Sequence, residues 1–351
     1  MTIIVTGGAG FIGSNFVNEW LAASDEAVVN LDKLTYAGNL DNLSKSDGAK
    51  HIFVRGDIND GVLVEKLLND HRPRAIINFA AESHVDRSIK DPDAFINTNI
   101  VGTFRLLTAS LKYFDGLSGQ DKEQFRFLHV STDEVYGSLL PSDPAFTEEN
   151  QFEPNSPYSA SKASADHLVR AYCQTYGLPT LTTNCSNNYG PYQFPEKLIP
   201  LVILNAISEK SLPIYGDGKQ VRDWLFVTDH CDAIKVVLKK GRVGETYNIG
   251  GESEMTNLDV VSKICEILDR IQPRKNGLSY SDLITYVKDR PGHDRRYAID
   301  IRKIKKELNW APTRDFDSGL ESTISWYLNN MEWVDRVRSG EYLHWIDKQY
   351  G

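Results

Sequence analysis

The first 23 residues restrict the possible folds of this chain more than any other segment. An apolar, β-branched run at 2–6 leads into Gly7, Gly10 and Gly13, spaced GxxGxxG, and a helical pattern follows at 14–23. Strand, glycine turn and helix occur in the order that a dinucleotide-binding βαβ unit requires. Gly7 and Gly10 let the backbone turn sharply and approach a pyrophosphate, whereas Gly13 lets helix and strand pack closely. These features predict a dinucleotide-binding α/β fold.

The second predicted strand, 27–31, ends at Asp32, which lies 19 residues after Gly13. A carboxylate here can accept hydrogen bonds from both ribose hydroxyls and would repel a 2′-phosphate, so NAD is favoured over NADP. The alternative is a glycine-rich turn without a ligand. Because strand, helix and acid are all in place, we expect NAD.

Further predicted strands end near the same site. One closes at 54–58, where Asp57 is placed to accept from the adenine amino group, and the next, 75–81, ends in two alanines small enough for a cofactor to lie against. A buried strand at 126–131 follows and runs into Thr132, Asp133 and Glu134. Ligands of doubly wound sheets bind outside the carboxyl ends of the strands, so we expect this polar cluster to lie over the nicotinamide.

Ser156 and Pro157 predict the start of a helix, on which Tyr158 and Lys162 are four residues apart and share one face. A phenol beside an ammonium is a potential base. Lowering the pKa of tyrosine from about 10 to about 7 requires roughly 4 kcal/mol of phenolate stabilisation, which is plausible only in a closed site. By spacing alone, the alternative is an ordinary surface pair.

Length and composition limit the class of protein. A chain of 351 residues predicts a nucleotide-binding domain and a smaller second domain. The formal charge of −9 and the absence of a Lys/Arg run argue against nucleic acid as a partner. No run of 18 apolar residues occurs and the opening residues already read as strand and turn, so we expect neither a membrane span nor a signal peptide. The four cysteines form no CxxC pair and no histidines pair at metal spacing, which predicts free thiols, no metal and a cytoplasmic protein.

The pattern of elements predicts how the two domains are arranged. Strands and helices alternate to about residue 183, and a loop rich in Asn, Tyr, Gly and Pro follows at 184–195. Later elements are helices at 196–210 and 256–270, strands at 212–215, 222–227 and 246–249, a helix capped by Thr228 or Asp229, and helices in the last 40 residues. We therefore expect a Rossmann doubly wound parallel sheet, built from 1–183 with returns at about 222–250 and in part of the C-terminus. An interleaved, smaller α/β substrate-binding domain occupies mainly 184–351.

Several motifs together resemble the extended short-chain dehydrogenase/reductases. They are GGAGFIG at 7–13, Asp32, FAAESHVD at 79–86, STDEVYG at 131–137, YSASK at 158–162, NNYGP at 187–191, RDW at 222–224 and RPGHD at 290–294. The triad Thr132-Asp133-Glu134 is similar to that of the nucleotide-sugar 4,6-dehydratases in this family, which implies dTDP-glucose as substrate.

The resemblance implies a catalytic role for each member of the cluster. Tyr158, supported by Lys162 and Thr132, takes the C4 hydroxyl proton of the sugar while hydride passes to NAD. Glu134 then takes the C5 proton, and a protonated Asp133 donates to the departing C6 oxygen. Adjacent acids push their titrations apart, which suits these opposite roles. Because neighbouring residues on a strand point in opposite directions, the chain must bend after Thr132.

The resemblance also implies two sets of binding residues. The cofactor set is Gly7, Gly10, Phe11, Ile12, Gly13, Asp32, Lys33, Leu34, Thr35, Asp57, Ile58, Phe79, Ala80, Ala81, Ser83, Thr98, Tyr158, Lys162 and Asn188. The substrate set is Ser83, Thr132, Asn187, Lys197, Leu198, Pro213, Ile214, Tyr215, Arg222, Asn257, Arg290 and His293.

Two other functions remain open at this point. A nucleotide-sugar 4-epimerase would share Tyr158, Lys162 and NAD but would not need the acid pair. A catalytically idle NAD-binding regulator would not need Tyr158 or Lys162, yet both are present. The resemblance further implies a homodimer that pairs through two helices of each subunit.

Overall fold

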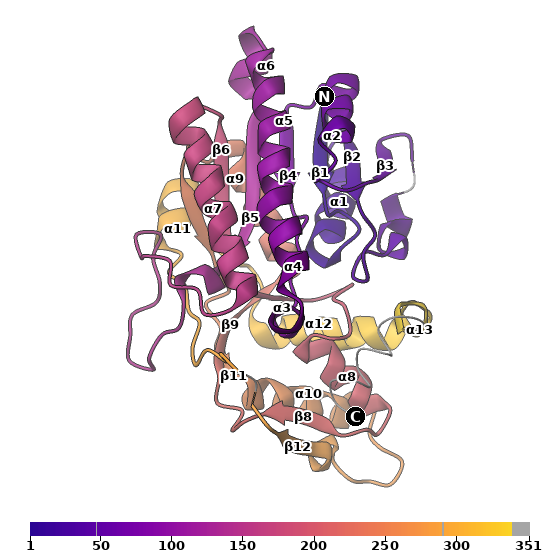
Figure 1. Ribbon diagram of the computed structural model, residues 1–351. Coiled ribbons are helices and arrows are strands. Elements are labelled where there is room, and N and C mark those ends of the chain that lie inside the picture. The colour runs from indigo at the N-terminus through magenta and orange to yellow at the C-terminus, as the bar shows by residue number, and fades with distance from the viewer. Residues whose placement is uncertain (47, 290, 339–351) are drawn as a thin grey trace.

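A seven-stranded parallel sheet forms the larger lobe of the computed structural model, which describes residues 1–46, 48–289 and 291–338 (Figure 1). Its strands lie in the order β10-β6-β5-β4-β1-β2-β3. Their bounds are β1 Thr2–Thr6, β2 Ala27–Asp32, β3 His51–Arg55, β4 Ala75–Asn78, β5 Arg126–Thr132, β6 Thr180–Cys185 and β10 Thr246–Ile249. The order changes direction beside β1, so the loops after β1 and β4 separate there and leave a crevice.

Helices cover both faces of this sheet, as the predicted doubly wound fold requires. One face packs against α1 (Phe11–Ala23), α9 (Val227–Lys240) and α11 (Arg302–Leu308), and the other against α2 (Gly61–His71), α5 (Thr103–Asp115) and α7 (Pro157–Tyr176). Strands buried on both faces read as continuous apolar runs, which explains the sequence of β1. The predicted fold class is confirmed.

The smaller lobe has its own core below the main sheet (Figure 1). Its strands form a three-stranded sheet of β7 (Asn187–Tyr189), β9 (Val221–Phe226) and β11 (Glu254–Thr256), and a two-stranded sheet of β8 (Leu212–Tyr215) and β12 (Ile284–Val287). Its helices are α8 (Leu198–Ile207), α10 (Asn257–Ile271), α12 (Phe316–Asn329) and α13 (Met331–Arg338). The chain crosses between the lobes several times, since β10 and α11 pack in the larger lobe after β9 has been placed in the smaller.

Short elements lie in the connections. They are the 3-10 helices η1 (Leu40–Ser46), η3 (Asp133–Tyr136) and η4 (Tyr280–Leu283), the helices α3 (Val85–Lys90), α4 (Pro92–Phe95) and α6 (Gly119–Gln124), and the π-helix η2 (Ile96–Gly102).

Several element boundaries differ from the sequence prediction, and three of them lie near the site or have a clear physical cause. β4 ends at Asn78 rather than at residue 81, and α8 begins at Leu198 rather than at 196. α9 begins at Val227 and has no side-chain cap, because the Asp229 carboxylate instead accepts from the backbone and hydroxyl of Thr313 and from the backbone of Arg314. The sequence pattern assigned the Asp229 carboxylate to the cap of α9, but this carboxylate is used in a contact between segments far apart in the chain.

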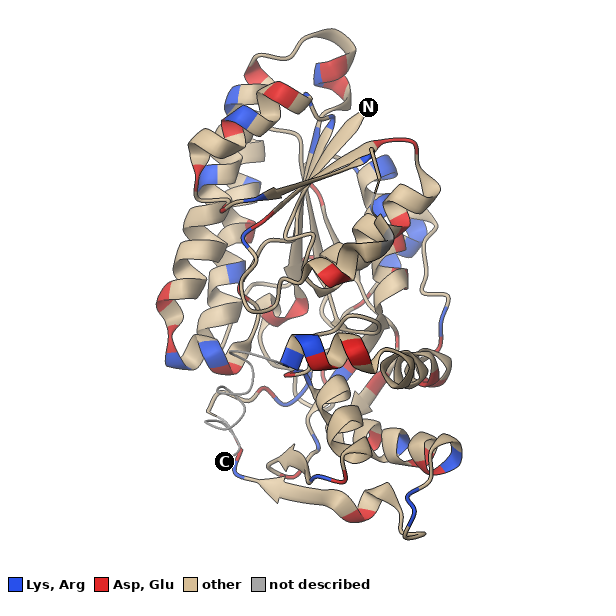
Figure 2. Cartoon of the chain, turned by 90° about the vertical axis from the view of Figure 1, so that its right-hand side faces the viewer, with Lys and Arg blue, Asp and Glu red and all other residues tan. Residues whose placement is uncertain are grey.

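The outer surface carries both signs of charge, interspersed along the helices (Figure 2). Among the described residues, no helix has the length and apolar character needed to cross a bilayer. In the same part of the chain, His, Cys, Asp and Glu side chains form no group of three or more that could hold a metal.

Candidate active site

The glycine loop fits against the end of β4. Gly7 has φ +71°, and a Cβ there would lie 2.6 Å from the backbone nitrogen of Ala80. A Cβ on Gly13 would lie 2.3 Å from the carbonyl oxygen of Gly7, whereas one on Gly10 would meet only that oxygen, at 3.3 Å. Side chains are therefore excluded at Gly7 and Gly13 by the fold itself. All three glycines line one pocket, so the backbone at Gly10 is open to a ligand.

Asp32 ties the glycine loop to the loop after β2. Its carboxylate accepts from the backbone of Ala9 and from that of Leu34, both at 2.8 Å. Burial raises the pKa of Asp32, although both backbone bonds oppose this. Asp32 also lines the pocket, so its carboxylate is within reach of a ligand there. Leu34 itself does not line the pocket but takes a left-handed conformation with φ 56°.

The chain bends immediately after β5. Thr132 is the N-cap of η3, and its hydroxyl accepts from the backbone of Glu134 at 3.3 Å. This 3-10 turn replaces the strand geometry in which neighbours point apart, and both Asp133 and Glu134 line the pocket. The bend that the proposed chemistry required is present.

Asp133 is in an environment that favours its protonated form. The residue is 2% exposed, and within the described structure its Oδ2 makes no hydrogen bond. Burial first, and then the neighbouring Glu134 carboxylate, raise the pKa of Asp133 well above its usual range. Arg222 opposes this shift. A buried carboxyl with an unpaired oxygen, in a residue that lines the pocket, is suited to donate a proton.

Tyr158 and Lys162 lie on α7, as predicted. Ser156 and Ser159 form a capping box at the start of this helix and Pro157 occupies its first position. Tyr158 is 9% exposed and Lys162 only 3% exposed, which excludes an ordinary surface pair. Both side chains line the pocket.

The pKa of Tyr158 is raised by its surroundings and is not lowered toward 7, the value that would favour a phenolate at neutral pH. Burial, and then the Glu134 carboxylate, raise it well above 10, while a hydrogen bond with Thr132 acts in the opposite direction. Lys162 donates to the carbonyl of Val130 at 2.9 Å. In this geometry the burial of the phenol outweighs any stabilisation of its phenolate.

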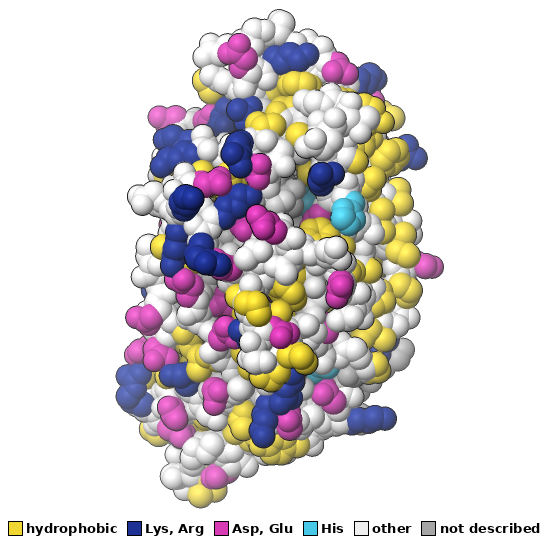
Figure 3. Space-filling view, turned by 90° about the vertical axis from the view of Figure 1, so that its left-hand side faces the viewer, with side chains coloured by type: hydrophobic (Ala, Val, Ile, Leu, Met, Phe, Trp, Pro, Cys, Tyr) yellow, Lys and Arg dark blue, Asp and Glu magenta, His cyan; other side chains and the backbone are white. Residues whose placement is uncertain are grey.

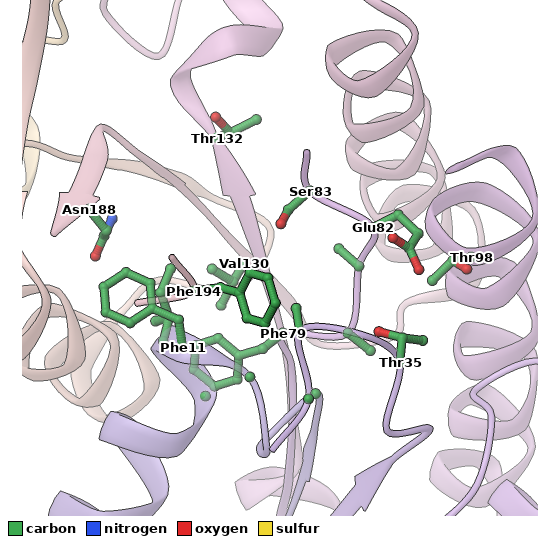
Figure 4. Close-up of a pocket in the computed structure, with 18 of the residues that line it drawn as sticks. Phe11, Thr35, Phe79, Glu82, Ser83, Thr98, Val130, Thr132, Asn188 and Phe194 are labelled. Carbon is green, nitrogen blue, oxygen red and sulfur yellow. The ribbon is translucent and has the colours of Figure 1, made fainter. Parts of the chain in front are cut away.

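Most predicted site residues meet in this one pocket. Those that line it are Gly7, Gly10, Phe11, Ile12, Gly13, Asp32, Lys33, Thr35, Asp57, Ile58, Phe79, Ala80, Ala81, Ser83, Thr98, Thr132, Asp133, Glu134, Tyr158, Lys162, Asn187, Asn188 and Lys197. Figure 4 shows part of this wall, with Phe11 and Phe79 near the floor, Thr35 and Thr98 at one end, and Asn188 at the other.

The other predicted substrate residues that the structure describes lie outside the pocket lining. Leu198 begins α8 and directly follows the lining residue Lys197. Pro213, Ile214 and Tyr215 are on β8, Arg222 is on β9, Asn257 begins α10, and His293 stacks edge-on against Tyr215. Arg290 lies outside the described residues.

Sequence reasoning missed Glu196, which lines the pocket although it is 5% exposed. Its carboxylate accepts from the Tyr36 hydroxyl at 3.0 Å and lies 3.4 Å from the Arg87 guanidinium. The Arg87 guanidinium also stacks 3.5 Å over the Tyr36 ring. Tyr36 and Glu196 lie in loops and Arg87 lies on α3, and because these segments are far apart in sequence no local pattern indicated their contact.

Comparison with known proteins places this pocket in a family. Residues 4–323 match the family described as GDP-mannose 4,6 dehydratase. The dTDP-glucose 4,6-dehydratase of Xanthomonas campestris pv. campestris (strain B100) is 61% identical over 342 residues, covering 97% of each chain. The chain belongs to the dTDP-glucose 4,6-dehydratase family. Another member, dTDP-glucose 4,6-dehydratase 1 of Escherichia coli (strain K12), is 56% identical and covers 100% of this chain and 99% of its own.

Solved structures agree with membership of the dTDP-glucose 4,6-dehydratase family. That of the Bacillus anthracis enzyme, in complex with NAD, is 49% identical with a TM-score of 0.85, covering 96% of this chain and 99% of its own. The UDP-glucose 4-epimerase of Thermotoga maritima has a TM-score of 0.83 but is only 29% identical, covering 94% and 100% of the two chains. Fold similarity thus extends to epimerases, whereas sequence identity favours the dehydratases.

Proposed function

We propose that this chain dehydrates dTDP-glucose to dTDP-4-keto-6-deoxy-glucose, with NAD as a retained cofactor. The observation that carries the proposal is the turn that brings Asp133 and Glu134 into one pocket with Tyr158. NAD, when bound, supplies a hydride acceptor for C4 and a donor for C6. The relatives of 61% and 56% identity are named as dTDP-glucose 4,6-dehydratases, which supports this function over 4-epimerisation.

The pocket fits a dinucleotide. Gly7 and Gly13 leave no space for side chains and the backbone at Gly10 is open to the pocket, as close approach of a pyrophosphate requires. Asp32 lines the same pocket and would accept from ribose hydroxyls while repelling a 2′-phosphate. We assign these residues, and the others of the predicted cofactor set that line the pocket, to NAD.

Three side chains would move the protons of the reaction. Tyr158 takes the proton of the C4 hydroxyl as a phenolate; because burial raises the pKa of the phenol, this step needs the positive charge of Lys162 together with that of the nicotinamide ring that bound NAD would bring. Once C4 is a ketone the C5 hydrogen is acidic, and Glu134 removes it as a proton. Asp133 donates its proton to the C6 oxygen, which leaves as water, and C5 later regains a proton from Tyr158 or from water.

The different burial of the two acids supports these opposite roles. Asp133 is 2% exposed and its pKa is raised, which favours its protonated form. Glu134 is more exposed than Asp133 and opposes ionisation of its neighbour. One carboxyl is thus held as an acid beside one available as a base, which elimination of water requires.

Substrate would extend from this pocket into the smaller lobe. We assign Ser83, Thr132 and Asn187 to the sugar and Lys197 and Leu198 to the nucleotide; Lys197 already donates to the Ser83 carbonyl at 3.0 Å. We also assign Arg222, Asn257, Arg290 and His293 to the diphosphate and ribose, and 213–215 to the base. Two nitrogens of the Arg222 guanidinium donate hydrogen bonds to the backbone carbonyls of Val221 and Asp294, which hold the guanidinium in position.

We also propose a cytoplasmic homodimer. Exposed apolar side chains occur on the outer helices of the larger lobe: Ile89 on α3, Ile96 on η2, Phe104 on α5 and Tyr176 on α7. Apolar side chains also gather along one edge of the molecule in Figure 3. Burying such side chains against a second copy would remove them from water. Sedimentation of the purified protein tests this assembly.

A single incubation tests the function. With dTDP-glucose, the purified protein should form a 4-keto sugar, detected by its absorbance in alkali, without added reductant. UDP-glucose in a parallel incubation tests the preference for the base. Conversion of dTDP-glucose to dTDP-galactose, or no reaction with it, would contradict the proposal.

A further inference from the structure

His129 lies in the interior beside the site, and the reaction described above gives it no role. It is in the middle of β5 and shares with Ser131 the strand face that meets α7. From α7 come Lys162 and Asp166, which are four residues apart and so lie on one side of the helix. The imidazole is fully buried.

The imidazole lies between an ammonium and a carboxylate. Its Nε2 is 3.3 Å from Nζ of Lys162 and 3.4 Å from Oδ1 of Asp166. Its Nδ1 is 3.1 Å from the side-chain amide nitrogen of Asn78 on the adjacent strand. The other oxygen of Asp166 accepts from Ser131 at 2.9 Å, so this carboxylate is fixed independently of Lys162.

The donors around His129 determine which nitrogen carries its proton. A neutral imidazole has one donor and one acceptor nitrogen, and an ammonium can only donate. Nε2 therefore accepts where Lys162 donates to it, which leaves the proton on Nδ1, whereas the opposite tautomer would donate from Nε2 to Oδ1 of Asp166. A proton on Nδ1 requires the Asn78 amide to be turned end for end from its placement, so that its oxygen accepts from Nδ1 and its nitrogen donates to the Thr6 hydroxyl, which is 2.6 Å from the other end of the amide.

We propose that His129 is a positioning residue: it accepts a hydrogen bond from Lys162 and keeps the ammonium apart from Asp166. The Val130 carbonyl and His129 then take two of the three N–H groups of Lys162, leaving the third for the pocket that Tyr158 lines. Without the imidazole, the ammonium would move onto the Asp166 carboxylate, one helical turn further from Tyr158. The inference rests on the proposed function of Tyr158 and Lys162.

The charges around His129 agree with a neutral ring. Burial, and then the charge of Lys162, lower the pKa of His129 to about 4, although Asp166 acts in the opposite direction. The other titratable groups that act on this cluster are the Cys185 thiol on β6, which affects Lys162, and the Asp133 and Glu134 carboxyls on η3, which affect Tyr158. Their positions relative to the site do not depend on His129.

Two substitutions separate positioning from a purely structural role. His129→Leu keeps an apolar volume but cannot accept a hydrogen bond, whereas the amide oxygen of His129→Gln can. We expect His129→Leu to lower kcat roughly 10²-fold, as for a displaced catalytic group, with little change in KM for dTDP-glucose. The acid limb of its kcat–pH profile should move to higher pH, because Tyr158 loses a nearby positive charge. His129→Gln should restore most of kcat and the original profile.

Thr323→Val is the matched control, since Thr323 is fully buried and, among the described residues, its hydroxyl bonds only within α12, to the Gly319 carbonyl at 2.8 Å. This variant should lose stability without moving the pH profile. A His129→Leu profile that coincides with that of the unmutated enzyme, after correction for the folded fraction, would overturn the inference.

A spectroscopic measurement tests the same point without catalysis. Long-range ¹H–¹⁵N spectra of the unmutated protein labelled with ¹⁵N-histidine, with His129→Gln to identify the signal, report the tautomer. We expect His129 to be neutral at pH 7 with its proton on Nδ1. A proton on Nε2 would overturn the inference even if dTDP-glucose is converted. If dTDP-glucose is not converted, the proposed function fails, and the tautomer still decides whether His129 accepts from Lys162.

Discussion

The Thr132 hydroxyl accepts a hydrogen bond from the backbone amide of Glu134 at 3.3 Å, and this contact closes the turn that follows β5. Its consequence is chemical, because the turn places Asp133 and Glu134 in one pocket with different burial. A site with an acid and a base beside each other can eliminate water, whereas a site with Tyr158 alone can only oxidise and reduce.

The two acids should fail in different ways. Asp133→Asn keeps size and polarity but cannot donate a carboxylic proton, so C5 should still exchange its hydrogen with solvent while water leaves slowly. Glu134→Gln removes the C5 base and should suppress both exchange and elimination. For each variant we expect turnover to fall by roughly 10²- to 10⁴-fold. Mass spectrometry of recovered substrate from D₂O distinguishes them; rapid C5 exchange in Glu134→Gln would contradict its role.

Asp133 should also lower stability at neutral pH. Its folded-state pKa is raised above the unfolded value near 3.9, so the folded protein binds the proton more tightly. Stability from this group is therefore fully present below about pH 3.9 and is lost as pH rises through the folded pKa. Asp133→Asn should thus be more stable than the unmutated protein at pH 8, with the difference shrinking toward pH 4. Urea unfolding at both pH values measures this, and an equal difference at both would contradict it.

Tyr158→Phe should bind dTDP-glucose nearly normally yet lose the first oxidation. Turnover should drop by roughly 10²-fold or more, because a positioned base is removed. Tyr176→Phe is the control on the same helix, because Tyr176 is 56% exposed at the far end of α7 and phenylalanine keeps the apolar ring that we assign to the dimer contact. Unchanged single-turnover kinetics in Tyr158→Phe would rule out the assignment.

Asp32→Ala should weaken binding of NAD by about 1.5 to 3 kcal/mol, the usual loss for charge-assisted hydrogen bonds. Part of the lost affinity will be indirect, because the Asp32 carboxylate also accepts from the backbones of Ala9 and Leu34 and so holds the two loops beside the pocket. Calorimetric titration of cofactor-free protein with NAD and NADP gives the affinities. Equal affinity of the unmutated protein for the two cofactors would contradict the role of Asp32.

Local patterns predicted those parts of the site that depend on neighbours in sequence. The GxxGxxG spacing and the pair Tyr158 and Lys162 are set by turn and helix geometry, and both appear where expected. His129 and Glu196 were missed because each is defined by contacts between segments far apart in the chain. The helix start at Asp229 was wrong for the same reason. The division into domains and the outer substrate residues stay predictions.

Transfer of the C4 hydrogen tests the central claim most directly. With dTDP-glucose deuterated at C4, the enzyme should deliver deuterium to C6 of a 4-keto-6-deoxy product, because the same hydride leaves C4 and returns at C6. NMR of the isolated sugar nucleotide locates the label. Deuterium retained at C4, together with dTDP-galactose as product, would show that the chain is an epimerase and that the roles of Asp133 and Glu134 are wrong.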